Sequence, residues 1–215
     1  MIDILGYSSE LINKKGVFKK MKKNISLLLI MLCILVISNL VLFAEETKYD
    51  FRKTNWGMSK EQVKAMEKGE IVLETEREVD FMVPDFDDNF KCGYLFLEDK
   101  LYRSLYLFIG EHTNKNDYIN DYERLKETLT KQYGKPRLDK VTWKNDLYKD
   151  NQQEWGTAIS IGHLSYNAYW ETSTTEIILI LFSVNSEITL FNAYISKELR
   201  EWAKEIKEKE TSKGL

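Results

Sequence analysis

Cysteine is scarce in this sequence, and its scarcity excludes one source of stability. The 215 residues include two cysteines, Cys33 and Cys92. Cys33 lies inside a long apolar run, so the rest of the chain cannot form an internal disulfide, even in an oxidising compartment. We expect Cys92, which precedes Gly93 at the start of an apolar segment, to be a buried and inert thiol. Stability must therefore come from an apolar core, and all five tryptophans lie after residue 44 to supply it.

Histidine is equally scarce, which leaves little for nucleophilic or acid–base catalysis. The two histidines, His112 and His163, each follow a glycine-containing stretch that is typical of a loop near the end of a strand. A hydrolase would need one of them beside a serine, a cysteine or a carboxylate. The sequence has no glycine-rich phosphate loop, zinc-ligand spacing or paired-carboxylate motif. We therefore expect a protein that is not an enzyme and binds no cofactor, with a hydrolase using either histidine as a less favoured alternative.

Positive charge is in deficit over most of the chain. The residues after Ala44 include 25 basic and 32 acidic side chains, a net charge of −7. Nucleic acids and anionic lipids are bound largely through lysine and arginine. We therefore expect no nucleic-acid partner.

An uncharged apolar run of 19 residues, Ile25–Phe43, is the most distinctive stretch of the sequence. Lysines precede it and Glu45 and Glu46 follow it, which is typical of a segment whose start stays in the cytoplasm while the rest is exported. Residues 21–44 form either a signal peptide cleaved after Ala44 or an N-terminal membrane anchor. The length leaves both open, because it exceeds a signal core of roughly 7–15 residues and just reaches a bilayer span of roughly 18–20.

The compartment follows in either case. Residues 45–215 form a single body outside the cytoplasm, in the periplasm, at the cell surface or in the medium. Residues 1–20 have no such pattern. We interpret them as a mis-assigned start, with Met21 as the true first residue, or as a cytoplasmic leader.

The first half of the body, about residues 45–112, begins with a helix signal. Ser59 and Gln62 have the spacing of a capping box and predict a helix of about ten residues that Gly69 ends. From residue 70 to residue 109 the apolar period drops to two, which predicts strands.

The best of these strands form a hairpin, Tyr94–Leu97 and Leu101–Ile109, with a three-residue loop between them. That loop would set Phe96 opposite Tyr102 and gather aromatic side chains on one face. Both faces would be apolar, so we expect the hairpin to be central and covered on both sides. The aromatic face is interpreted as core or, alternatively, as a ligand-binding platform. Its residues are Tyr94, Phe96, Tyr102, Tyr106 and Phe108.

The second half, about residues 113–215, repeats the order of helix and strands. Apolar spacing predicts a helix over 117–133 and a closing helix after Ser196. Between them we expect a loop over 146–154 and strands over 138–143, 157–161, 164–172, 176–184 and 187–195. This order predicts an α+β fold with antiparallel sheet or sheets, helices packed on one face, and two similar helix-plus-sheet halves.

Two further groups of residues are candidates for binding. Asp85, Asp87 and Asp88 form an acidic cluster that could hold calcium, although it lacks the glycine and the closing glutamate of a calcium loop. Trp155, in a polar stretch next to Gly156, is the tryptophan best placed to be exposed and to stack on a sugar ring.

The segment Trp56-Gly57-Met58-Ser59-Lys60-Glu61-Gln62-Val63 resembles the opening motif of many small exported bacterial domains. These include the small lipoprotein of the outer-membrane β-barrel assembly machinery and the secreted β-lactamase inhibitor proteins. Tyr133-Gly134-Lys135-Pro136 is similar to the Gly-x-Pro that closes a helix in such domains. The resemblance implies helices packed on one antiparallel sheet and a non-catalytic domain that binds another protein.

The sequence therefore favours a non-enzymatic protein of the cell envelope that acts by contact with another envelope or secreted protein. If the apolar run is not cleaved, the membrane would be a second partner through Ile25–Phe43. The alternative function is a small-molecule or glycan-binding module that uses an aromatic sheet face or Trp155.

Overall fold

The computed structural model describes residues 49–83 and 89–213. The predicted signal or anchor, residues 21–44, and the acidic cluster of Asp85, Asp87 and Asp88 lie outside these ranges. Within the two ranges, no helix combines the length and the apolar character needed to cross a membrane.

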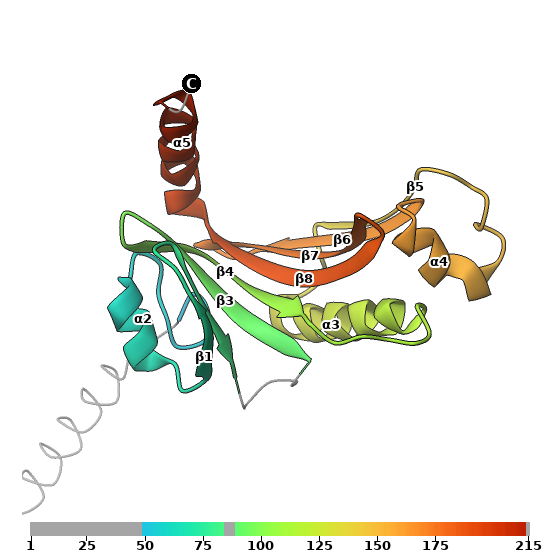
Figure 1. Cartoon of the computed structure of the whole chain (residues 1–215), viewed down its shortest axis with the longest axis horizontal. Helices are drawn as coiled ribbons and strands as arrows, with labels where there is room; N and C mark the ends of the chain where they lie inside the picture. Colours follow the sequence, from blue (N-terminus) through green and yellow to red (C-terminus); the bar gives the residue numbers. More distant parts are fainter. Residues whose placement is uncertain (1–48, 84–88, 214–215) are drawn as a thin grey trace, which may run out of the picture. The chain divides into compact units, whose positions relative to one another are not determined.

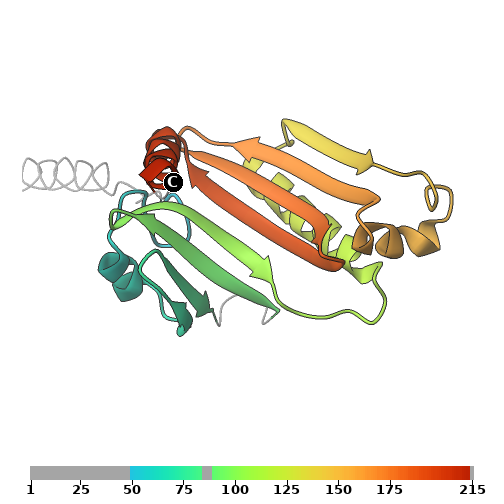
Figure 2. The same cartoon turned by 45° about the horizontal axis from the view of Figure 1, so that its top comes forward.

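One continuous sheet of eight antiparallel strands forms the centre of the fold (Figure 2). The sheet order is β1-β2-β3-β4-β8-β7-β6-β5, so strands that follow one another in the chain are neighbours everywhere except at the centre, where β4 pairs with β8. The α+β class and the antiparallel sheet are confirmed. The strands are β1 (Glu70–Glu74), β2 (Glu78–Met82), β3 (Phe90–Leu97), β4 (Lys100–Phe108), β5 (Leu138–Trp143), β6 (Leu164–Glu171), β7 (Thr175–Val184) and β8 (Glu187–Ser196).

Each block of four strands follows one helix. Helix α2 (Lys60–Met66) precedes β1 to β4, and helix α3 (Asp117–Tyr133) precedes β5 to β8. This order agrees with two helix-plus-sheet halves, whose similarity in structure stays a prediction. A short 3₁₀ turn (Gln152–Glu154) and helix α4 (Trp155–Ser160) interrupt the second block between β5 and β6, and α5 (Lys197–Lys213) closes the chain.

The capping box predicted at Ser59 is present. The Ser59 hydroxyl accepts from the Gln62 backbone N–H at 3.3 Å, and the Gln62 side chain accepts from the Ser59 N–H at 2.9 Å. Helix α2 has seven residues rather than about ten, because the backbone of Glu67 is already extended. Ser196 likewise caps α5, accepting from the Leu199 N–H at 3.1 Å.

The prediction of a strand over 157–161 is wrong, since this segment lies in and just after α4. Gly156, Ala158 and Ile159 are all buried, a pattern that a strand with alternating faces does not give. The segment is held by contact with the start of α3, where the Asn116 side chain accepts from the Gly156 N–H at 2.6 Å. Tertiary contacts therefore override a short apolar run whose own period is ambiguous.

The predicted register of the β3–β4 hairpin is also wrong. The turn has two residues, Glu98 and Asp99, both with positive φ, so Leu97 lies opposite Lys100 and Phe96 opposite Leu101. A register shift between Leu95 and Phe96 marks a bulge. The bulge moves Tyr102 away from the face that carries Tyr94 and Phe96, because one extra residue inverts the alternation of side chains.

The two faces of the sheet are covered by different elements. Helices α3 and α4 contact β6, β7 and β8 on the face that holds the main core. Helix α5 contacts β4 and β8. A smaller apolar cluster lies there, formed by Leu97 of β3, Tyr102 of β4 and Ala203 of α5. Figure 1 shows α5 and α3 on opposite sides of the sheet. The expectation that all helices pack on one face therefore does not extend to α5. Much of the face beside α5 carries no helix (Figure 2).

Gly156 generates a test of the contact between α4 and α3. A Cβ atom at Gly156 would overlap the backbone at Lys115 and Asn116, which cannot move without displacing the start of α3. We expect Gly156→Ala to lower the free energy of unfolding by about 1–3 kcal/mol, measured by urea denaturation. The neighbouring Thr157→Ala is the control, with a change below about 0.5 kcal/mol. Equal effects of the two substitutions would contradict this packing.

Candidate functional site

The aromatic face of the β3–β4 hairpin is core rather than an open platform. Tyr94 and Phe96 are fully buried in the main cluster, and Tyr102 lies under α5 on the other face. Phe108 is partly buried against the same cluster and packs edge-on against Phe90. Tyr106 differs from the other four, because its side chain reaches the wall of a cavity. The predicted ligand-binding platform is thus reduced to Tyr106.

Trp155 is half-buried at the start of α4, not exposed as expected. Its indole N–H donates to the Lys149 carbonyl at 3.1 Å, and its ring packs edge-on against Trp143 at 5.8 Å. The ring is one of the partly buried side chains around the core. Its position therefore favours a packing role over stacking on a sugar.

The two histidines lie apart from each other. His112 Nε2 is 2.6 Å from Asp121 Oδ2, and its ring stacks on Phe108. His163 lies near the Tyr148 ring, and its Nδ1 is buried without a hydrogen-bond partner in the described residues. Within those residues, no serine or cysteine is hydrogen-bonded to either imidazole, and neither histidine lines the two cavities described below.

A metal site is not apparent in the described part of the chain. No group of three or more histidine, cysteine, aspartate or glutamate side chains there is arranged to hold an ion. The acidic cluster of Asp85, Asp87 and Asp88 falls outside the described residues, so the calcium hypothesis stays a prediction.

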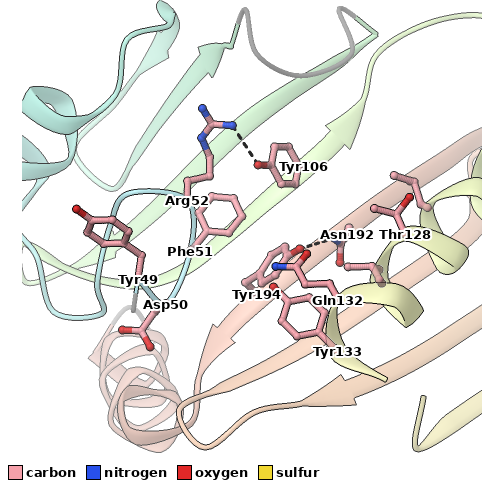
Figure 3. A pocket seen from close by; sticks show the side chains of 12 residues that line it. Tyr49, Asp50, Phe51, Arg52, Tyr106, Thr128, Gln132, Tyr133, Asn192 and Tyr194 are labelled. Atoms are coloured by element: carbon pink, nitrogen blue, oxygen red, sulfur yellow. Dashed lines mark hydrogen bonds between the residues drawn. The ribbon is translucent and has the colours of Figure 1, made fainter. Parts of the chain in front are cut away.

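A cavity of about 290 Å³ lies where the two blocks of strands meet. Its walls are the N-terminal segment Tyr49–Arg52, the C-terminal half of α3, and the paired strands β4 and β8 (Figure 3). Aromatic rings from all of these elements surround it, and polar side chains are interspersed among them. The aromatic residues are Tyr49, Phe51, Tyr106, Tyr133 and Tyr194; the other lining residues are Asp50, Arg52, Leu125, Thr128, Leu129, Gln132 and Asn192.

A buried polar network holds the N-terminal wall of this cavity in place. Arg52 Nε lies 2.9 Å from Glu67 Oε1, and Arg52 Nη1 donates to the Tyr106 hydroxyl at 3.2 Å. The Tyr94 hydroxyl donates to the same oxygen of Glu67 in a short hydrogen bond. Because the Glu67 side chain is almost completely buried, each donor to it compensates for lost solvation. Burial is also the main reason why the pKa values of Tyr94 and Tyr106 lie well above their ordinary value.

Asn192 is the polar residue at the base of the cavity. It is only 3 % exposed and lies directly opposite Tyr106 in the β4–β8 register. Its Nδ2 donates to the Tyr194 hydroxyl at 3.0 Å, as Figure 3 shows, whereas its Oδ1 is buried and accepts no hydrogen bond from the described residues. A buried acceptor without a donor is costly and rare in folded proteins.

A second, open groove of about 450 Å³ lies over β5, β6 and β7. Successive side chains of a strand point to opposite faces of the sheet. Since Tyr166, Leu179 and Leu181 point to the core face, which α3 and α4 cover, the floor of the groove lies on the opposite face. Ile180 and Phe182 are half-buried in the floor, and Lys140 and Lys144 are exposed at the rim. Neither lysine has an ion-pair partner in the described part of the chain.

Sequence reasoning missed the residues that matter most in both sites. Asn192 stands between Leu190 and Tyr194 at a core-facing position of β8, so a polar residue at an inward position of a strand was the available signal. Arg52 lies between the predicted export segment and the predicted helix that begins at Ser59, and no sequence pattern marks it as a site residue.

Comparisons with protein-family models, with curated proteins and with solved structures find no match for this chain.

The buried thiol generates a test of the core beneath the cavity. Cys92 is completely buried, and that burial raises the pKa of its thiol well above the ordinary value. The reactive thiolate is therefore rare as well as inaccessible. In protein covering residues 45–215, where Cys92 is the one cysteine, we expect an aromatic disulfide reagent at pH 8 to modify the native state at least about 100-fold more slowly than the state unfolded in urea. Equal rates in the two states would contradict the burial of Cys92.

Proposed function

We propose that this protein is a non-enzymatic, exported domain of the cell envelope that acts by contact with another protein. The contact surface is the groove over β5, β6 and β7, and the occupant is an acidic segment of the partner. The observation that carries the proposal is the combination of an apolar floor with two rim lysines that have no ion-pair partner in the described residues.

The floor belongs to a wider apolar area of the sheet. Ile180 of β7 pairs with Phe191 of β8, and Phe191 pairs with Leu107 of β4. All three side chains are half-buried. Phe182 and Phe191 pack edge-on at 6.2 Å. Contiguous apolar side chains that remain partly exposed are typical of protein-contact surfaces.

The rim supplies the charge that selects the partner. The chain after Ala44 has a net charge of −7, yet the side chains of Lys140 and Lys144 reach solvent together beside the groove. A carboxylate of the partner would neutralise this local positive charge and would be repelled by most of the remaining surface.

The edge of the sheet supplies backbone groups for the same contact. β5 pairs with β6 alone in the described residues, so its outer edge is open. An extended segment can add to such an edge as a further strand. A segment paired with β5 would place alternate side chains beside Leu138, Lys140 and Thr142 on the groove face, so that an Asp or Glu among them would lie next to Lys140.

The predicted export segment supports the compartment. Residues 21–44 have the charge asymmetry of a signal peptide or anchor, which would bring residues 45–215 into contact with envelope or secreted proteins.

A random-peptide display selection tests this proposal. We expect wild-type protein, covering residues 45–215, to enrich peptides in which Asp or Glu lies within two residues of a large apolar side chain. The double variant K140E/K144E should bind the enriched peptides at least about tenfold more weakly, because two attractions become repulsions. The control is K204E on α5, where Lys204 is exposed and distant from the groove.

Three outcomes would contradict the proposal. They are a selection without enrichment, enriched peptides that lack acidic residues, and equal losses in K140E/K144E and K204E.

Sedimentation of the wild-type protein tests whether a second copy of the chain occupies the groove. A dimer that K140E/K144E dissociates would show that a second copy of the chain fills the groove.

A further inference from the structure

We propose that the cavity between the N-terminal segment, α3 and the β4–β8 pair binds a single neutral sugar ring. This site is separate from the groove over β5 to β7 and lies on the other face of the sheet. Four features point to this ligand: an unpaired buried amide, charged groups that already have hydrogen-bond partners, tilted aromatic rings and a polar mouth.

The unpaired end of the Asn192 amide favours a ligand that carries a hydroxyl group. One end of the amide is hydrogen-bonded to the Tyr194 hydroxyl, and the other end is buried at the base of the cavity without a partner in the described residues. If the oxygen and nitrogen of the amide were exchanged, the unpaired atom would be a donor instead of an acceptor. A ligand hydroxyl satisfies both cases, because it can donate and accept.

The charged groups around the cavity already have hydrogen-bond partners. Asp50 accepts from the Trp56 N–H at 3.0 Å through one oxygen and from the Thr174 hydroxyl at 2.6 Å through the other. Arg52 is paired with Glu67. An anionic ligand would therefore compete with Glu67 for Arg52 and would lie close to the Asp50 carboxylate, which is unfavourable. A neutral ligand needs no such rearrangement.

The aromatic walls favour a puckered ring over a planar one. The Phe51 ring lies 5.2 Å from Tyr106 and 4.7 Å from Tyr194, with interplanar angles of 54° and 52°. Tyr106 and Tyr194 are themselves nearly perpendicular, at 78°. These three rings leave no parallel pair that could sandwich a flat base, whereas the C–H face of a sugar needs one ring to pack against.

The size of the cavity and its mouth agree with one ring. At roughly 30 Å³ per water in the liquid, about 290 Å³ corresponds to about ten waters, close to the dozen heavy atoms of a hexose. Thr128 and Gln132, both on the exposed side of α3, border the opening. The Thr128 hydroxyl donates to the Arg124 carbonyl and keeps its lone pairs for a ligand hydroxyl.

Saturation-transfer NMR with a panel of neutral monosaccharides tests this inference. The panel is glucose, galactose, mannose and N-acetylglucosamine, and glucuronate and glucosamine are the charged comparisons. We expect at least one neutral sugar to bind with a dissociation constant on the order of 1 mM, since a ligand of this size makes few contacts. Glucuronate should bind at least about tenfold more weakly, because its carboxylate would compete with Glu67 for Arg52.

Three variants distinguish the cavity from other surfaces. Thr128→Trp places a large ring at the mouth from an exposed position of α3, so it should abolish transfer to the sugar while leaving the melting temperature unchanged. Glu127→Trp is the matched control on the same helix turn, outside the cavity, and should bind as the wild type does. Asn192→Ala should weaken binding at least about tenfold through the lost hydrogen bond.

The inference is overturned if no neutral sugar gives a signal at tens of millimolar. It is equally overturned if glucuronate binds better, or if Thr128→Trp and Glu127→Trp bind alike. K140E/K144E should bind sugar as the wild type does, so that a failure of the peptide-binding groove and a failure of the sugar site remain distinguishable.

Discussion

The pairing of β4 with β8 is the constraint on which the cavity and the continuity of the sheet depend. Five residue pairs, from Arg103 with Ile195 to Leu107 with Phe191, join two four-stranded blocks into one sheet. On one face this register sets Tyr106 beside Asn192 and so creates the base of the cavity. On the other face it sets Leu107 beside Phe191 and extends the apolar area that begins at the groove. If the two blocks were separate, each would have an additional open edge, the cavity would lose one wall, and the apolar area beside the groove would end at β8.

The N-terminal segment is held by both blocks, which explains how a short irregular stretch can form a cavity wall. Arg52 reaches Glu67 and Tyr106 in the first block. Trp56 donates its indole N–H to the Thr175 hydroxyl at 2.9 Å, and Asp50 accepts from Thr174, both at the start of β7 in the second block. The position of the wall is thus set by polar contacts from opposite directions, and the ring of Phe51 fills the space between them.

Much of the fold followed from local rules, and the misses have identifiable causes. The capping box at Ser59, the helix over 117–133 and most of the strands depend on spacing within one element, which a sequence displays directly. Tyr102 was placed on the wrong face because a single bulge inverts the alternation that follows it. The short helix after Trp155 depends on Asn116, forty residues earlier in the chain. Long-range contacts of this kind leave no periodic signal.

The candidate sites were harder to predict than the fold for a related reason. A residue such as Asn192 becomes notable only when the side chains around its amide are known, and those come from α3, β4 and the N-terminal segment. Lys140 and Lys144 belong to a sequence rich in lysine, and what distinguishes them is their place beside an apolar groove, without an ion-pair partner in the described residues. Tyr106 was the one predicted ligand-binding residue that the structure brings to a cavity, because alternation fixed its face and register placed it beside β8.

The central position of β8 has a consequence for the order of folding. β8 is the last strand in the described part of the chain, yet it lies in the middle of the sheet and pairs with β4 on one side and β7 on the other. The two blocks can join only when residue 103 pairs with residue 195, and contacts so distant in sequence form slowly. The meander of β1 to β4 can form from contacts close in sequence, before β8 is available. The continuous sheet is closed only when β8 enters the centre between β4 and β7.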